Sequence, residues 1–299
     1  MQSSTNHNME NLASIYIQPD ISFYSNVEDV FSEETEYERY IFPEEKKPDF
    51  WEILRTRKTI LVAEPGYGKT RLLQELVKNA KGKNRKAIYA DLKKSVKKGI
   101  EIYLCQLMTQ RTAIKTEDFD LINTSDVVVC LDALDEVKQD EYSDTIEQIS
   151  AFVEKFDHIS VIVSSRLHHL AKHKEIFNNL GFRHAIIHRF SEKQARLFLR
   201  NCHFSNEDID NIFDSLRFQG RDLVIQTPRY LELLARYMKG KDISTAESIT
   251  ITDLFEYFIY RKLELEDKKY NRQQRDIINL NPERIVWDQR FRVILRLNF

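Results

Sequence analysis

The stretch TILVAEPGYGKT, from Thr59 to Thr70, decides the fold of this chain. Its first five residues are apolar or β-branched and predict a short buried strand, whereas its glycines predict a tight turn. The residues that follow have apolar side chains at three- and four-residue spacing, which predicts a helix from Lys69 to Asn79. A strand, a glycine-rich turn and a helix in this order are typical of a phosphate-binding loop.

This loop carries the groups that a nucleoside triphosphate requires. Its glycines let the backbone N–H groups point at the β-phosphate, where the N-terminus of the helix adds partial positive charge. Lys69 is expected to reach the β and γ oxygens, and Thr70 to ligate Mg²⁺. The first glycine of the usual motif is Ala63 here, which fits if that residue keeps a negative φ. An ordinary glycine-rich turn is the alternative. The residues expected to contact the nucleotide are Glu64, Pro65, Gly66, Tyr67, Gly68, Lys69, Thr70 and Arg71.

A second apolar segment, VVVCL from Val127 to Leu131, leads into the acidic sequence DALDE. Ligands of open α/β sheets bind at the carboxyl ends of the strands, so we expect Asp132 to hold Mg²⁺ there, directly or through water. Asp135 or Glu136 is then placed to orient an attacking water molecule. A helix N-terminus that carries acids is the alternative, but its position after a phosphate loop favours a nucleotide site.

A third strand, from Ile159 to Ser164, ends near the cation Arg166. Arg166 is in position to sense a γ-phosphate, and a surface arginine at a strand end is the alternative. Further strands and helices alternate along the chain, which predicts a parallel sheet covered on both faces. These are strands at 87–92 and 185–188 and helices at 99–109 and 144–156. The predicted fold class is α/β, a P-loop NTPase with a parallel sheet between helices.

A helical subdomain is predicted after the sheet, over residues 191–265. Ser191 with Gln194 and Ser205 with Asp208 have the spacing of capping boxes, and Pro228 suits a first helical position. The best helices are 192–201, 228–238 and 252–265. Residues 50–190 form the predicted nucleotide-binding domain, and residues 1–49 an acidic segment whose IYI and ISFY pieces lie on it. Residues 266–299 carry no clear capping or periodic signal.

Composition argues against several classes of protein. The chain has 45 basic and 47 acidic residues, so its charge does not require a nucleic-acid or membrane partner. The basic run from Lys78 to Lys98 is compatible with a contact to nucleic acid, but we interpret it as a solvated loop. No stretch approaches the roughly 18 apolar residues of a membrane span. The three cysteines show no paired spacing, which favours the reducing cytoplasm. A metal site at His168, His169 and His173 is disfavoured because no suitably spaced carboxylate or thiol accompanies them.

Taken together, these motifs resemble those of NACHT-domain ATPases of the STAND class, which include animal NOD-like receptors and many bacterial antiphage proteins. The resemblance spans roughly Tyr16 to Leu265. It rests on AEPGYGKT at 63–70, LDALDE at 131–136, SSR at 164–166, FSE at 190–192 and TPRYL at 227–231. The second motif is the most specific, because in that family a small residue follows the metal-binding aspartate and further acids come two and three places after it.

The resemblance implies a role for each matched residue. Lys69 and Thr70 correspond to the Walker A pair and Asp132 to the Walker B metal ligand. Arg166 corresponds to the sensor residue, and Pro228 to a nucleotide contact from the helical subdomain. Members of this class switch between a closed ADP-bound form and an open ATP-bound form that oligomerises, and they hydrolyse ATP slowly. The implied cofactors are therefore ATP or ADP and Mg²⁺.

Two functions are expected on this basis. The first is a slowly hydrolysing ATPase switch in antiviral or innate immune signalling, working as a nucleotide-dependent homo-oligomer. The second is a non-hydrolysing nucleotide-binding scaffold that assembles with a partner effector or sensor protein. A P-loop motor or helicase is disfavoured because translocation motifs are not recognisable.

Proteins of the NACHT class usually carry an effector domain and a repeat sensor. Neither is recognisable here, so we expect a truncated, frameshifted or dissected member or one half of a two-protein system. On that expectation, residues 266–299 would be the start of a truncated winged-helix region.

Overall fold

The computed structural model describes residues 15–24, 50–83, 85–95, 98–113, 115, 119–120, 122–123, 127–218, 220–239, 252–257 and 259–260. They fall into two compact units, one from Tyr16 to Gln194 and one that comprises Ile15 and the described residues from Ala195 onward. The first unit holds the sheet, and the described part of the second is helical. The predicted α/β class is confirmed at this level. Most of the acidic segment and the whole of 266–299 lie outside the described residues, and the domain boundaries stay predictions.

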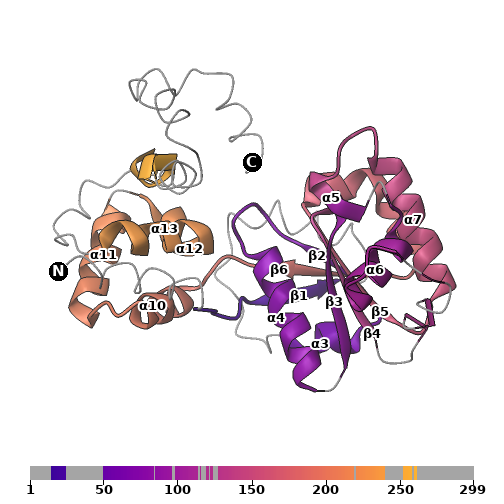
Figure 1. Ribbon diagram of the computed structural model, residues 1–299. Coiled ribbons are helices and arrows are strands. Elements are labelled where there is room, and N and C mark those ends of the chain that lie inside the picture. Colours follow the sequence, from indigo (N-terminus) through magenta and orange to yellow (C-terminus); the bar gives the residue numbers. More distant parts are fainter. Residues whose placement is uncertain are drawn as a thin grey trace, which may run out of the picture. The chain divides into compact units, whose positions relative to one another are not determined.

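Six strands form one sheet in the order β1-β6-β2-β5-β4-β3 (Figure 1). They are β1 (Ile21–Tyr24), β2 (Lys58–Val62), β3 (Lys86–Asp91), β4 (Val127–Asp132), β5 (Ser160–Ser165) and β6 (Arg183–Ile187). The five strands from β2 to β6 are parallel and match the predicted strands to within one or two residues at each end. The ISFY piece is extended and lies on this domain, as predicted: it is β1, an edge strand of the sheet. It pairs antiparallel with β6, so the sheet is mixed.

Both faces of the sheet are covered by helices (Figure 1), as predicted. One face packs against α3 (Phe50–Arg55) and α4 (Lys69–Gly82). The other packs against α6 (Ile100–Thr109), α7 (Tyr142–Lys155), α8 (Leu167–Leu170) and α9 (Lys174–Asn179). Successive side chains of a strand point to opposite faces. In β4, Val128 and Cys130 therefore pack on the α4 side, while Val127 and Val129 pack on the α6 and α7 side.

The connections between strands create a switch point at the centre of this sheet. From β2 the chain passes through α4 to β3 at the far edge, whereas from β5 it passes through α8 and α9 to β6, on the opposite side of β2. The chain thus leaves two neighbouring strands in opposite directions. Open α/β sheets bind ligands at the carboxyl ends of such strands. The phosphate loop follows β2, and Arg166 follows β5, so both lie at this point.

The second unit confirms the predicted helix starts. Its helices are α10 (Glu192–Asn201, which begins in the first unit), α11 (Asn206–Phe218), α12 (Asp222–Gln226), α13 (Pro228–Met238) and the helical residues 252–257 and 259–260. The Ser191 N–H donates to Gln194 Oε1 at 2.8 Å, and the Asp208 N–H donates to Ser205 Oγ at 3.1 Å. Pro228 is the first residue of α13. The predicted end of the last helix, at 265, lies outside the described residues.

Candidate functional site

The loop between β2 and α4 has the backbone that an anion site requires. Gly66 and Gly68 have φ values of 85° and 96°, in the left-handed region where a side chain is strained. Ala63 is not among the described non-glycine residues with positive φ, so alanine fits the first motif position as expected. No described side chain caps the N-terminus of α4, and no acid lies in its first turn. The first N–H groups of the helix can therefore serve a bound anion.

Lys69, the first residue of α4, lies at the meeting point of several charged groups. Its ammonium donates to the carbonyl oxygen of Ala63 at 2.6 Å. Burial lowers the pKa of Lys69, and nearby carboxylates act against that shift. The charged residues that influence it are Asp135, Arg166, Glu64 and Asp132. The structure thus brings the predicted lysine, acids and arginine into electrostatic reach of one another.

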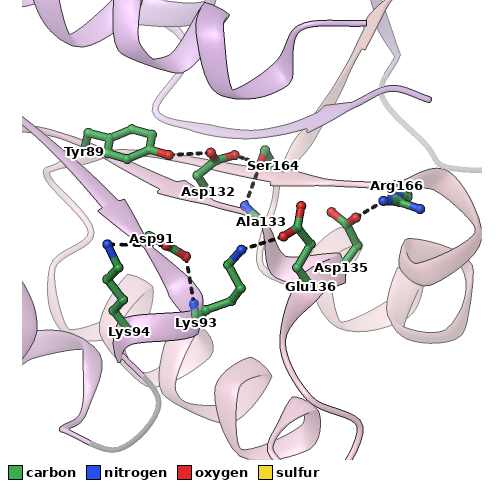
Figure 2. Close-up of polar contacts among 10 residues, drawn as sticks. All are labelled: Tyr89, Asp91, Lys93, Lys94, Asp132, Ala133, Asp135, Glu136, Ser164 and Arg166. Carbon is green, nitrogen blue, oxygen red and sulfur yellow. Dashed lines mark hydrogen bonds and ion pairs between the residues drawn. The ribbon is translucent and has the colours of Figure 1, made fainter. Parts of the chain in front are cut away.

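Asp132 ends β4 with only 3% of its surface exposed, and both of its carboxylate oxygens accept hydrogen bonds (Figure 2). Tyr89 Oη donates to Oδ2 at 2.6 Å, and Ser164 Oγ donates to Oδ1. Ser164 Oγ in turn accepts a hydrogen bond from the backbone N–H of Ala133 at 2.9 Å. The predicted metal ligand is therefore held between the neighbouring strands β3 and β5.

The chain turns sharply directly after Asp132. Ala133 has φ 63° and ψ 46°, a left-handed conformation that costs an L-residue about 1–2 kcal/mol. The 3₁₀ turn η3 (Leu134–Glu136) follows, and the Glu136 N–H donates to the Ala133 carbonyl at 3.1 Å. A β-branched or bulky residue at position 133 would be strained more than alanine is. The turn presents the two remaining acids of the motif to different partners.

Asp135 forms a buried ion pair with Arg166. Figure 2 shows the contact between the two side chains. Arg166 Nε lies 2.7 Å from Asp135 Oδ2, and the exposed fractions of the two side chains are 16% and 3%. The other oxygen, Asp135 Oδ1, is buried and has no hydrogen-bond partner among the described residues. The predicted sensor arginine and one of the two candidate acids are therefore bound to each other in this structure.

Glu136 forms a second ion pair, which is far more exposed. Its Oε2 lies 2.6 Å from the ammonium of Lys93, and the exposed fractions of the two side chains are 39% and 42%. The hydrogen bond to Glu136 raises the pKa of Lys93. Lys93 also donates its backbone N–H to Asp91 at 3.1 Å, and the Lys94 ammonium lies 3.8 Å from Asp91. Part of the basic run from Lys78 to Lys98 thus borders the site, which sequence reasoning did not foresee.

Tyr89 and Ser164 were also not predicted as site residues. Each lies on the α4 face of its strand, next to the carboxyl edge, together with Asp132. The signal that could have found them is the two-residue period of the strands, combined with the order in which the strands are paired. That order depends on pairing between segments far apart in the chain.

Other predicted loop residues have partners of their own. Tyr67 is buried, and its hydroxyl oxygen accepts a hydrogen bond from Arg189 Nε at 2.5 Å, so its ring forms part of the core beneath the loop. Arg71 pairs with Glu75 at 3.1 Å. Pro228 lies in the second unit. The contacts of Glu64, Pro65, Thr70 and Pro228 with a nucleotide stay predictions.

No cluster of three or more histidine, cysteine or acidic residues that could hold a metal ion exists in the part of the chain that the structure describes. The predicted Mg²⁺ does not require one, because Mg²⁺ is usually bound by one or two protein oxygens together with phosphates and water. His169 and His173 lie against the ring of Tyr142, with centroid distances of 6.3 and 4.9 Å. Burial lowers the pKa of both histidines.

Comparison with known proteins gives no family for this chain. A scan against protein-family models found no match, and a search of curated proteins found none. Within the described ranges, no helix has the length and apolar character to span a bilayer. The argument for function therefore depends on the motifs and the geometry of the site.

Proposed function

We propose that this chain binds ATP with Mg²⁺ through a P-loop and works as a slowly hydrolysing switch of the NACHT type. The observation that carries the proposal is that a glycine-rich loop, a buried aspartate and an arginine meet at the switch point of the sheet. Lys69, Asp132 and Arg166 follow or end three different strands, and both Asp132 and Arg166 act electrostatically on Lys69. A chance glycine-rich turn would have no reason to lie beside these groups.

Each group would have a distinct task toward the nucleotide. Lys69 and the N-terminus of α4 would bind the β- and γ-phosphates. Thr70 and Asp132 would hold Mg²⁺, which neutralises phosphate charge when bound. Asp132 suits this role because its described partners are two hydroxyl groups, which leave its negative charge uncompensated by an ion pair. The unpartnered Asp135 Oδ1 supplies a further buried acceptor near Lys69.

A non-hydrolysing scaffold is the second candidate, and a specific observation favours it. Asp135 is paired with Arg166 and Glu136 with Lys93, so both acids that could orient water are engaged. A carboxylate that already contacts a cation is not free to orient an attacking water molecule. In such a protein nucleotide would control assembly with a partner, and turnover would be negligible.

The proposed output is antiviral or innate immune signalling, through a nucleotide-dependent homo-oligomer or a partner effector or sensor protein. This part of the proposal is supported by the resemblance of the quoted motifs to NACHT proteins.

The experiment measures Mg²⁺-dependent ATP hydrolysis and the mass of the purified chain in solution with ADP and with ATP. Lys69→Ala, Glu136→Gln and Lys86→Ala are compared with the wild type. Lys86 is the control, because it is exposed at the opposite end of the sheet, at the first residue of β3. A switch turns over slowly and enlarges with ATP; Glu136→Gln still enlarges but no longer turns over, and Lys69→Ala does neither.

The scaffold gives a different pattern in the same experiment. Wild type enlarges with ATP but hydrolyses it no faster than Lys69→Ala, and Glu136→Gln alters assembly alone. Wild type that neither hydrolyses ATP nor responds to it in mass, while remaining folded, contradicts both candidate functions. Lys86→Ala should match the wild type throughout.

A further inference from the structure

The carboxylate of Asp132 is held on both sides by hydroxyl groups from the neighbouring strands (Figure 2). We propose that Tyr89 and Ser164 are positioning residues that fix Asp132 for Mg²⁺, so that these two hydroxyls set the metal dependence of nucleotide binding. This inference rests on the proposed function and adds to it two residues to which the motifs gave no role: Tyr89, which lies outside them, and Ser164, the first residue of SSR.

The sheet register places the three side chains on one face. In β4, Asp132 shares the α4 side with Val128 and Cys130, because side chains alternate along a strand. Leu131 pairs with Val163, so the next residues along, Asp132 and Ser164, lie side by side. This explains the direct contact between the Ser164 hydroxyl and one carboxylate oxygen.

Tyr89 reaches the other carboxylate oxygen from two residues further back, because Asp91 is the residue of β3 that pairs with Asp132. Tyr89 pairs with Cys130, so Asp132 is its diagonal neighbour on the same face. Diagonal neighbours in a sheet lie within reach of aromatic side chains. A shorter residue at position 89 could not span this distance. The length of tyrosine is therefore what brings a hydroxyl to Asp132 at 2.6 Å.

The hydrogen bonds also fix the direction of each proton. Ser164 Oγ accepts the Ala133 N–H, so its own proton is directed toward Asp132. Tyr89 Oη lies 2.6 Å from Asp132 Oδ2, and a phenol beside a carboxylate, which only accepts, donates its one proton to it. Each carboxylate oxygen can accept about two hydrogen bonds or ligands, so one direction on each stays open. The hydroxyls orient the carboxylate without neutralising it.

A purely structural role makes a different prediction. Hydroxyls that only satisfy a buried carboxylate would contribute to stability, and their loss would weaken nucleotide binding equally with and without Mg²⁺. Hydroxyls that orient a metal ligand affect the metal itself, and the loss of such partners typically costs about 10- to 100-fold in metal affinity. The Mg²⁺ concentration at half-maximal nucleotide binding separates the two roles.

The test uses the whole chain and a fluorescent ATP analogue, titrated with Mg²⁺. Tyr89→Phe keeps the ring and removes only the hydroxyl, and Ser164→Ala is compared with Ser164→Thr, which keeps it. Ser160→Ala is the matched control, because Ser160 is buried at the other end of the same strand. Thermal unfolding without ligand is recorded for every variant, so that loss of fold is recognised.

We expect the half-maximal Mg²⁺ concentration to rise about 10- to 100-fold in Tyr89→Phe and in Ser164→Ala, with metal-free nucleotide affinity unchanged. Ser164→Thr and Ser160→Ala should stay close to the wild type. Folded variants with an unshifted Mg²⁺ dependence, or with equal losses in both conditions, overturn the positioning role and leave the proposed function intact. Wild type that binds no nucleotide contradicts the proposed function itself, and the metal role with it.

Discussion

The carboxyl edge of the sheet carries two polar networks that differ in burial. The buried network consists of Tyr89, Asp132, Ser164, Asp135 and Arg166; the exposed network consists of Asp91, Lys93, Lys94 and Glu136. In the first, the carboxylates of Asp132 and Asp135 are almost completely covered. In the second, the paired side chains of Lys93 and Glu136 are each about two-fifths exposed, at 42% and 39%.

This difference indicates which acid can change partners. Breaking a buried pair leaves an uncompensated charge in a poorly solvated place, whereas an exposed pair exchanges its partner for water at little cost. Asp135 is therefore fixed by Arg166, while Glu136 can leave Lys93 when a phosphate or a partner protein attracts the lysine. Sequence alone left Asp135 and Glu136 as equal candidates for orienting water. The comparison favours Glu136.

The largest effect is expected at the buried pair. Arg166→Met leaves the Asp135 carboxylate without its cation, which should lower the free energy of unfolding by about 3–5 kcal/mol. Urea unfolding measures this change. Adding Asp135→Asn removes the buried charge and should restore more than half of the loss. A cost for Arg166→Met below about 1 kcal/mol, the range of exposed pairs, would show that the two networks do not differ as described.

The exposed pair should contribute much less. A double-mutant cycle with Lys93→Met and Glu136→Gln is expected to give a coupling free energy of up to about 1 kcal/mol. That coupling should shrink further in about 1 M salt, because exposed charges are screened. Urea unfolding of the four proteins supplies the cycle. A coupling of about 3 kcal/mol or more, the range expected for loss of a buried partner, would contradict the comparison.

The smallest expected effect is a pH dependence of stability that arises from two histidines beside the buried network. Burial lowers the pKa of His169 and His173, so the folded chain favours their neutral forms. Below about pH 6.5 the unfolded chain binds more protons at these sites than the folded chain does, so stability falls as the pH is lowered. The urea concentration at the unfolding midpoint should therefore fall as the pH is lowered from about 7.5 to about 5.5. The fall should be smaller in the double variant that carries His169→Gln and His173→Gln.

A histidine in the second unit gives the control for this measurement. His203 is exposed and has φ 71°, a conformation that asparagine tolerates. His203→Asn should keep the wild-type pH dependence. An equally steep dependence in the double histidine variant and in the wild type would mean that other groups govern acid stability.

Much of the fold followed from local sequence pattern. The five parallel strands were predicted because each is a short run rich in Val, Ile or Ala bounded by turn residues or helix starts. The phosphate loop and α4 followed from glycine spacing and helical period. The direction of β1 did not, because four residues of ISFY carry no information on which neighbour they pair with. The six-residue helix α3 was missed because it is too short to show a helical period.

The site was predicted only where its residues lie in one continuous motif. Lys69 begins the helix after the phosphate loop, Asp132 ends β4 and Arg166 directly follows β5, and local sequence pattern predicts each of these places. Tyr89 meets Asp132 across 43 residues, and Ser164 meets it across 32, so neither contact exists until the strands are paired. The pairing of Lys93 with Glu136 is non-local in the same way. The positive φ of Ala133 belongs to the turn from β4 into η3, and nothing in an alanine residue predicts it.

The most direct test of the central claim is equilibrium binding of Mg²⁺ with ATP to the wild type, Lys69→Ala and Lys86→Ala. Loss of the Lys69 ammonium removes charge-assisted hydrogen bonds to phosphate, each worth about 1.5–3 kcal/mol, so affinity should fall about 100-fold. Lys86→Ala should bind as the wild type does. Equal affinities in the wild type and a folded Lys69→Ala would contradict a phosphate site at this loop, and with it the proposed function.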